Sequence, residues 1–394
     1  MVVSSRQQDE VRDFRIRSVC MSLPSMQNPE RGLFVRHRLE AMSKRARIDA
    51  LCPQPWFPFL RSWSQEINPD GASFETSYLP MPYLPRIGKF LDSYWMQRTI
   101  LNWLKPAFVS SGSEQILDAH FGYPEGVACW RVAQKLKIPC FVTLRGVEEE
   151  WVKQRLVRKQ LRQCLESVDG IIAVSRSLAS LAQKLGAKEH RIRIIPNGVD
   201  RQVFFPTKTD IVQNRTLKIV CVGNLRHVKG HDTLLRAFAR LAKLKFEFEL
   251  RLIGEATEPT FARSVEHLIS ELGLVTKVKN LGSLNQLKLS HVLRQSDLFV
   301  LASRREGCCN AILEALASGL PVVATDVGDN HKYVRSGING QLVAADDEIA
   351  LAKAIQHVAR QEFDHQAVSE SVAICSWDQT AQEVIEFMAE RLSA

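Results

Sequence analysis

Two glutamates, Glu306 and Glu314, are separated by seven residues and lie between two short apolar runs. The runs, residues 298–303 and 321–326, are typical of buried strands in a parallel sheet. The segment between them therefore predicts a loop and one short helix. Glu306 would lie in the loop at the carboxyl end of a strand, and Glu314 would project from the second turn of the helix. The alternative is that Glu306 only ends a loop and that Glu314 is a solvated helix residue.

The start of this helix is a candidate anion site. Asn310 is the expected N-cap, residues 311–318 favour a helix, and Gly319 with Pro321 makes a stop signal. Backbone N–H groups at a helix N-terminus, together with the helix dipole, favour a phosphate. The residues that would offer those groups are Cys308, Cys309, Asn310 and Ala311. The flanking carboxylates suit sugar hydroxyls instead, because a carboxylate accepts hydrogen bonds from hydroxyls and repels anions.

The second half of the chain alternates strands and helices, which predicts a parallel sheet. Its expected strands are residues 217–223, 248–254, 278–282, 298–303, 321–326 and 340–344. In the loop after the first strand, Gly223 permits a tight turn and Lys229 can reach a phosphate as a mobile point charge. Ligands of such sheets bind at strand carboxyl ends. Lys229 is therefore a candidate phosphate ligand, although a lysine in a loop is usually only a surface residue.

The first half of the chain predicts another parallel sheet. Gly32, where a loop enters the helix of residues 33–44, allows a close backbone approach to a ligand. His120 and Arg145 each end an expected strand, at the edge where ligands bind. A lone histidine is usually structural, but one at a strand end before a turn of glycine and proline favours a functional role.

The bulk composition is that of a soluble globular protein with two domains. The chain has 394 residues, of which 45% are hydrophobic and 24% charged, and no apolar run of about 18 residues that would predict a spanning helix. Residues 1–203 hold 30 basic and 20 acidic side chains (net +10), whereas residues 204–394 hold 22 and 23 (net −1). An anionic partner is therefore expected at the first half.

Three further segments carry simple expectations. Residues 1–13 are polar and lack an apolar signal core, so we expect disorder and a cytoplasmic location. Residues 200–216 are polar, contain Pro206 and form the expected interdomain linker. The nine cysteines show no C-x-x-C pair, which favours reduced thiols.

Aromatic and basic segments of the first half raise the question of a membrane surface. Residues 52–105 hold four of the seven tryptophans, beside many prolines. Tryptophan and tyrosine next to arginine and lysine suit the membrane interface or a groove for a lipid-linked substrate. The alternative is that they simply pack against the first domain. The basic side chains within residues 153–162 form a solvated face or a contact for anionic lipid headgroups.

These motifs together resemble those of the retaining family 4 glycosyltransferases with the GT-B fold, over nearly the whole chain. The similar stretches are Gly32, "DAHFGYPEG", "AVSRSLASLAQKLG", "IIPNGVD", "VGNLRHVKGHDTLLRAFARL", "REGCCNAILEALASGLPVVATDVG" and the terminal "SW" helix. The resemblance implies an α/β protein of two facing Rossmann-like domains with an interdomain cleft. It assigns residues 14–203 to acceptor binding, residues 204–375 to donor binding, and residues 376–394 to a helix that crosses back to the first domain. It also implies retention of anomeric configuration and no essential metal, and the chain has no D-x-D motif.

The resemblance assigns roles to single residues. Glu314 would bind the donor ribose, Glu306 the C3 and C4 hydroxyls of the donor sugar, and Lys229 the diphosphate. His120 would lie beside the reacting carbon. Two residues depart from the family pattern. Asn224 stands where many members have arginine, a charge that Arg226 could supply, and Arg145 stands on the acceptor side where many have histidine.

The resulting hypothesis is a glycosyltransferase that moves a sugar from a UDP- or GDP-linked donor to a glycan or lipid-linked saccharide. It would act in cell-surface polysaccharide biosynthesis, without a permanently bound cofactor or metal, in the cytoplasm or peripherally on the inner membrane face. Clustered tryptophan and proline suit a membrane surface better than a nucleic acid. The alternatives are a non-catalytic nucleotide-sugar-binding scaffold, and a nucleotide-sugar epimerase or a phosphorylase on the same fold.

Overall fold

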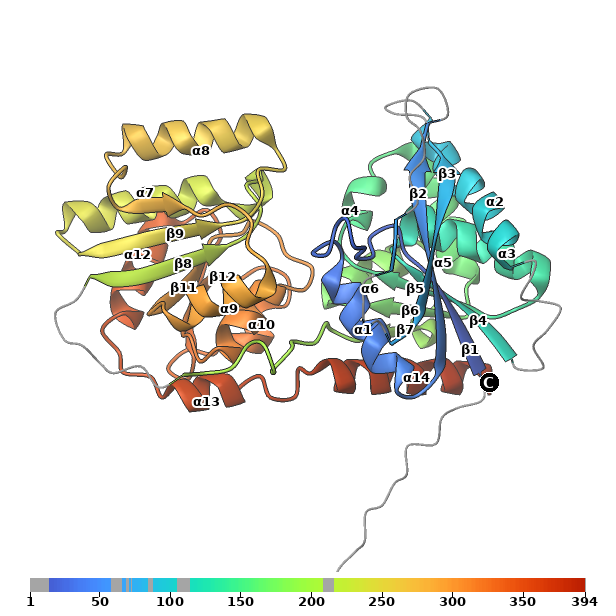
Figure 1. Cartoon of the computed structure of the whole chain (residues 1–394). Helices are drawn as coiled ribbons and strands as arrows, with labels where there is room; N and C mark the ends of the chain where they lie inside the picture. Colours follow the sequence, from blue (N-terminus) through green and yellow to red (C-terminus); the bar gives the residue numbers. More distant parts are fainter. Residues whose placement is uncertain are drawn as a thin grey trace, which may run out of the picture. The chain divides into compact units, whose positions relative to one another are not determined.

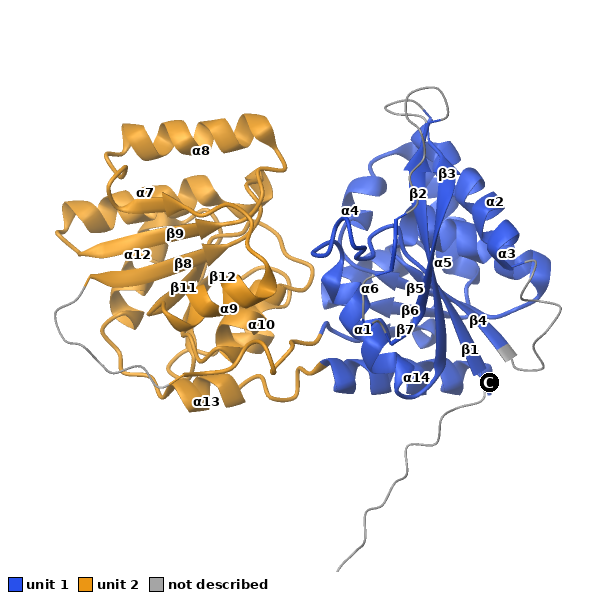
Figure 2. Ribbon diagram, viewed as in Figure 1, with its two compact units in different colours: residues 1–197, 377–394 blue, residues 198–376 orange. Residues whose placement is uncertain are grey.

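The computed structural model describes residues 14–57, 66–68, 71, 73–83, 88–104, 114–207 and 216–393. The expected disorder of residues 1–13 lies outside this part of the chain, as does much of the expected linker. The chain forms two compact units, residues 1–197 with 377–394 and residues 198–376 (Figure 2). The expected boundary lay after residue 203. The units divide earlier because Val199 and Phe204 are buried in the core of the second unit.

The first unit is built on a seven-stranded sheet in the order β3-β2-β1-β4-β5-β6-β7, and every strand pair is parallel. The order reverses between β1 and β4, which makes this pair the topological switch point of the sheet. The strands are β1 Phe14–Val19, β2 Arg47–Trp56, β3 Glu75–Pro82, β4 Glu114–His120, β5 Cys140–Leu144, β6 Gly170–Ala173 and β7 Ile192–Ile194 (Figure 1).

Helices join these strands and cover the sheet. They are α1 Leu33–Ser43, η1 Lys89–Leu91, α2 Asp92–Leu104, η2 Gly122–Gly126, α3 Val127–Leu136, α4 Glu148–Trp151, α5 Arg155–Ser167, α6 Arg176–Lys184 and η3 Glu189–Arg191. The last helix, α14 Trp377–Leu392, belongs to this unit although the chain reaches it from the second. Its apolar side is buried against the sheet, where Phe387 meets Phe141 edge to face at 6.0 Å.

Two aromatic side chains of α2 contact neighbouring elements of the first unit. The ring of Tyr94 on α2 lies 3.9 Å from the Arg131 guanidinium on α3. The indole N–H of Trp103 donates a hydrogen bond to the Ser77 hydroxyl at 3.2 Å, and Arg17 lies over the same ring. The structure therefore shows packing for Trp103, whereas Tyr94 remains 52% exposed. None of the described helices is long and apolar enough to cross a membrane.

The second unit repeats the architecture with a six-stranded parallel sheet, in the order β10-β9-β8-β11-β12-β13. Its strands are β8 Leu217–Val222, β9 Phe248–Ile253, β10 Val278–Asn280, β11 Leu298–Leu301, β12 Val322–Thr325 and β13 Gly340–Val343. Its helices are η4 His227–Lys229, α7 His231–Lys243, α8 Pro259–Glu271, α9 Gln286–Arg294, α10 Asn310–Ala317, α11 Asn330–Tyr333, α12 Glu348–Val358 and α13 His365–Glu370.

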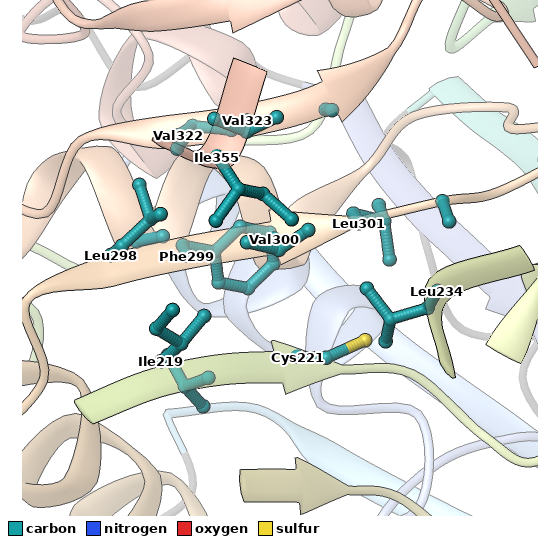
Figure 3. Close-up of a cluster of buried hydrophobic side chains, with 14 of the residues drawn as sticks. Ile219, Cys221, Leu234, Leu298, Phe299, Val300, Leu301, Val322, Val323 and Ile355 are labelled. Carbon is teal, nitrogen blue, oxygen red and sulfur yellow. The ribbon is translucent and has the colours of Figure 1, made fainter. Parts of the chain in front are cut away.

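Continuous apolar runs form the centre of this second sheet, as expected for strands covered on both faces. Phe299, Val300 and Val323 are fully buried, and Ile355 of α12 packs over them (Figure 3). The predicted α/β class with two Rossmann-like domains is confirmed. The interdomain cleft stays a prediction.

Candidate active site in the second unit

Two loops of the second unit meet because their strands are neighbours. β8 and β11 pair in parallel, so the loop before α7 and the loop before α10 leave the same edge of the sheet. The backbone N–H of Arg304 donates to the Val228 carbonyl at 2.8 Å and joins the loops directly. Gly230, at φ 65°, packs against the other loop so closely that a Cβ atom would lie 1.9 Å from the Ala302 carbonyl oxygen. Only glycine fits at this crossing.

This crossing brings together two residues predicted to act at one site. The Lys229 ammonium lies 2.7 Å from Oε1 of Glu306, and the Ser303 hydroxyl donates to the same oxygen at 2.6 Å. Glu306 is 8% exposed. Burial alone would lower the pKa of Lys229, but the Glu306 carboxylate outweighs burial and raises it, so the lysine is charged at neutral pH.

Two supporting residues of this pair were missed by the sequence analysis. Ser303 orients the Glu306 carboxylate, as described above. Gly328, at φ 59°, packs on the backbone of Glu306, where a Cβ atom would lie 2.4 Å from its carbonyl oxygen. Serine and glycine are too common in loops for either residue to be a signal on its own.

The helix after Glu306 begins one residue earlier than expected. Asn310 is the first residue of α10 and Cys309 occupies the N-cap position, without a side-chain capping bond. The prediction of Asn310 as the N-cap is therefore wrong. Cys309 is 4% exposed, and its burial in the core outweighs the intrinsic capping preference of asparagine. The α10 N-terminus nevertheless follows Glu306 directly, as the spacing predicted.

Glu314 lies in the second turn of α10 and is partly buried. Among the described residues, no side chain or backbone N–H hydrogen-bonds its carboxylate. Burial raises the pKa of Glu314 to about 7. Glu314 is therefore not a fully solvated helix residue, and its role in ligand binding stays a prediction.

The other residues of the first loop serve its structure. The Asn224 side chain accepts a hydrogen bond from the Glu255 N–H at 3.1 Å, and Arg226 pairs with Glu258 at 3.1 Å on the surface. Gly223 has no left-handed backbone, and a Cβ atom there would meet nothing closer than 3.5 Å. The turn after β8 therefore does not require glycine at position 223. The close approach belongs to Gly254, whose Cβ atom would lie 2.2 Å from the Gly223 carbonyl oxygen.

His120, the predicted residue of the first unit, is fully buried at the carboxyl end of β4. Its Nδ1 lies 2.9 Å from a nitrogen of Arg145, and its Nε2 lies 2.9 Å from the Ser18 hydroxyl and 3.2 Å from Asp118. A guanidinium can only donate, so Nδ1 must accept and the ring proton is on Nε2. Burial lowers the pKa of His120 to about 4, which keeps the ring neutral.

Arg145 and His120 are part of a larger buried polar network. Arg145 also donates to the Asn197 side chain at 2.9 Å, and burial lowers its pKa to about 9. Arg38 of α1 pairs with Asp118 at 3.2 Å, and both side chains are buried. Arg38 was not among the predicted site residues. One inward position in a charged helix gives no clear signal without the register of the helix.

Gly32 has a structural explanation. Its φ is 65°, and a Cβ atom would lie 1.8 Å from the Ser22 carbonyl oxygen. The close backbone approach predicted at Gly32 is therefore to the preceding loop of the same unit. Among the described residues, no cluster of three or more histidine, cysteine or acidic side chains is placed to hold a metal ion.

Both halves of the chain match models of known protein families. Residues 216–361 match the family described as "Glycosyl transferases group 1", and residues 61–203 match "Glycosyltransferase Family 4". The chain belongs to the family 4 glycosyltransferases. It is therefore a glycosyltransferase enzyme, as the motifs around Lys229 and Glu306 predicted.

Two named relatives show the range of this family. The chain is 26% identical over 281 residues to the N-acetyl-alpha-D-glucosaminyl L-malate synthase of Bacillus anthracis, covering 68% of this chain and 72% of the relative. It is 28% identical over 253 residues to the lipopolysaccharide core biosynthesis mannosyltransferase LpsB of Rhizobium meliloti, covering 59% and 69%. The named activities of these two relatives differ, so similarity alone does not assign an acceptor to this glycosyltransferase.

Solved structures confirm the fold. The sucrose-phosphate synthase of Thermosynechococcus elongatus superposes with a TM-score of 0.78 at 19% identity, covering 96% of this chain and 99% of that one. The Anabaena protein HepE, solved in complex with UDP and glucose, gives a TM-score of 0.72 at 17% identity, covering 95% and 99%. Both likenesses support the GT-B arrangement of two Rossmann-like domains.

Proposed function

We propose that this glycosyltransferase moves a sugar from a nucleotide diphosphate sugar to a glycan or lipid-linked saccharide with retention of configuration. The observation that carries the proposal is the Lys229–Glu306 pair, 2.7 Å apart, at the edge where α10 begins. A cation, a hydroxyl-binding carboxylate and a helix N-terminus at one strand edge match the parts of a nucleotide sugar. Glu314, on the same helix, is the proposed ligand of the ribose hydroxyls.

Donor binding changes the partner of Lys229. In the free protein its ammonium neutralises Glu306; a diphosphate, with its larger charge, attracts the ammonium and leaves the carboxylate to accept from sugar hydroxyls. The residues proposed to line the donor site are Gly223, Asn224, Arg226, Lys229, Glu306, Cys308, Cys309, Asn310, Ala311 and Glu314. Arg226 adds little to the phosphate charge while Glu258 pairs with it on the surface.

The rate then comes from stabilising the leaving group. As the bond between sugar and phosphate breaks, C1 gains oxocarbenium character and negative charge grows on the diphosphate. Lys229 and the N–H groups at the start of α10 oppose that charge, each worth about 2–4 kcal/mol by analogy with an oxyanion-hole donor. The departing phosphate oxygen takes the acceptor proton, without a covalent enzyme intermediate and without a metal.

In the first unit we propose that His120 positions Arg145. A neutral ring with both nitrogens engaged holds the guanidinium at the carboxyl end of the sheet, on the acceptor side. Arg145 is only partly buried and can therefore meet a ligand, whereas His120 is fully buried. Arg145 in place of the usual histidine then gives this chain a positive group where many relatives have a neutral one.

The setting we propose is surface-polysaccharide biosynthesis at the inner face of a membrane. The similarity to LpsB supports a surface glycan, and the likeness to HepE, solved with UDP, supports a uridine nucleotide over guanosine. The exposed basic face of α5 supports peripheral contact with anionic lipid.

A thermal-shift screen with UDP, GDP, ADP and their sugar conjugates tests the donor site. One nucleotide should stabilise the wild type, and Lys229→Ala and Glu314→Ala should each lose that shift. Lys243→Ala on α7 and Glu271→Ala on α8 are matched exposed controls that should keep it. If no nucleotide shifted the unfolding temperature of the folded wild type, the proposed donor site would be rejected. Binding without sugar transfer would favour the scaffold, and conversion of the donor sugar without acceptor would favour the epimerase.

A further inference from the structure

The first unit contains a cavity of about 580 Å³ that lies within this unit alone. Its walls come from the loops that follow β1, β4 and β5, at the switch point of the sheet. This is where open α/β sheets bind their ligands. Six apolar side chains supply most of the lining: Met21, Phe121, Tyr123, Pro124, Val147 and Trp151.

Two aromatic rings form a fixed wall of the cavity. The Tyr123 hydroxyl donates to the Lys89 carbonyl, which holds its ring in place. Trp151 packs against it with ring centroids 5.4 Å apart and planes tilted by 59°. Tyr123 is 1% exposed, whereas Trp151 is partly exposed to the cavity. A rigid tryptophan face at an open cavity suits a ligand with its own apolar face.

The polar groups of the lining carry no net charge. Glu125 is 3% exposed and accepts a hydrogen bond from the Met21 N–H at 3.1 Å. Burial raises the pKa of Glu125 to about 8, with Glu148 adding to the rise and Arg31 opposing it, so the carboxyl group is mostly protonated at neutral pH. Lys153 and Glu150 pair at 2.6 Å, and both side chains are exposed, so their charges cancel at the edge of the lining. A phosphate or carboxylate placed here would meet Glu150 as well as Lys153, so the lining offers an anion no net positive charge.

We propose that this cavity binds the acceptor of the transfer reaction through a neutral sugar ring. The C–H face of the ring packs on Trp151, and a hydroxyl of the ring hydrogen-bonds to Glu125. This inference rests on the proposed function. It narrows the acceptor of the transfer reaction to a glycoside whose sugar ring in the cavity is uncharged. It separates this chain from family members whose named acceptors carry a carboxylate, such as the L-malate synthase relative.

Ligand-observed saturation-transfer NMR on the full chain tests the proposal. The probes are methyl glycosides of glucose, galactose, mannose and N-acetylglucosamine, and the 6-phosphates of the first three, each with and without UDP or GDP. At least one neutral glycoside should bind, more tightly than its phosphate. Trp151→Leu and Glu125→Leu should weaken that binding about tenfold or more. Glu125→Gln, which retains hydrogen bonding at the site, should preserve most of it and serves if the leucine variant fails to fold.

Matched controls and the nucleotide screen separate the two proposals. Trp103→Leu, on α2, and Glu189→Gln, an exposed residue of the same unit, should leave glycoside binding unchanged. Tighter binding of the phosphates, binding that Trp151→Leu leaves intact, or binding of octyl but not methyl glycosides would each overturn the neutral-sugar assignment. A chain that binds UDP or GDP but none of these glycosides would also overturn it, while leaving the donor site of the second unit standing.

Discussion

Replacing Lys229 with methionine should destabilise the second unit, because it leaves the Glu306 carboxylate buried without its cation. Removing one partner of a buried ion pair costs about 3–5 kcal/mol. The Ser303 hydroxyl still donates to Glu306, and the Lys229 side chain is 23% exposed in the wild type. We therefore expect a smaller loss, about 2–3 kcal/mol. For a unit of this size that is a fall in Tm of roughly 4–12 °C.

The distribution of tryptophan lets one experiment follow the two units separately. All seven tryptophans lie outside residues 198–376. Intrinsic tryptophan fluorescence therefore reports the first unit, while calorimetry and circular dichroism report both. In Lys229→Met only the transition without a fluorescence change should move to lower temperature. Lys243→Met, on the exposed face of α7, is the matched control and should leave both transitions unchanged.

The double variant Lys229→Met/Glu306→Gln completes the test. Removing both charges should recover most of the lost stability, with a coupling energy of about 1–3 kcal/mol. Losses that simply add in the double variant would refute the ion-pair argument.

Three further predictions concern single side chains. Glu314→Gln should increase the free energy of unfolding at pH 8 by about 1 kcal/mol and have little effect at pH 5. The reason is that the raised pKa makes ionised Glu314 unfavourable in the folded state above pH 7. Urea denaturation at both pH values measures this difference. Gly230→Ala should destabilise the second unit by about 3 kcal/mol or more, whereas Gly223→Ala should cost about 1 kcal/mol or less. Of these two glycines, only Gly230 combines a left-handed backbone with a steric clash at the Cβ position. Calorimetry compares the two variants. Arg38→Met should destabilise the first unit by about 3–5 kcal/mol by leaving Asp118 unpaired, and Arg38→Met/Asp118→Asn should recover most of it by tryptophan fluorescence.

The sheets and the strand-end positions of the site could be predicted because local pattern decides them. A continuous apolar run such as residues 298–303 allows little besides a buried strand, and parallel sheets place their loops at one edge. Lys229 and Glu306 could therefore be expected at the same edge, and they pair there. Glu314 followed from its position in the helix after Glu306.

The features that the sequence did not predict depend on contacts between segments far apart in the chain. Gly230 and Gly328 are required by close approaches to Ala302 and Glu306, which only the packed loops reveal. The start of α10 depends on burial of Cys309, a tertiary effect stronger than the capping preference of Asn310. The neutral state of His120 likewise depends on the burial of its ring in the packed unit, which lowers its pKa.

The positive charge of the first unit predicts a contact with anionic lipid, and the neutral lining of its cavity predicts a contact with an uncharged sugar. The dependence of binding on ionic strength distinguishes these two contacts. Arg155, Arg158, Lys159 and Arg162 are exposed on α5, beside Leu156, which is 53% exposed. Vesicles containing anionic phospholipid should therefore bind the protein at low salt and release it as ionic strength rises, whereas binding of a neutral methyl glycoside should be almost insensitive to salt. Reversing Arg158 and Lys159 to glutamate should weaken vesicle binding in a sedimentation assay without changing glycoside binding. Equal binding to uncharged vesicles would refute an electrostatic contact with lipid. Loss of glycoside binding in that variant would show that the basic face and the cavity are not independent.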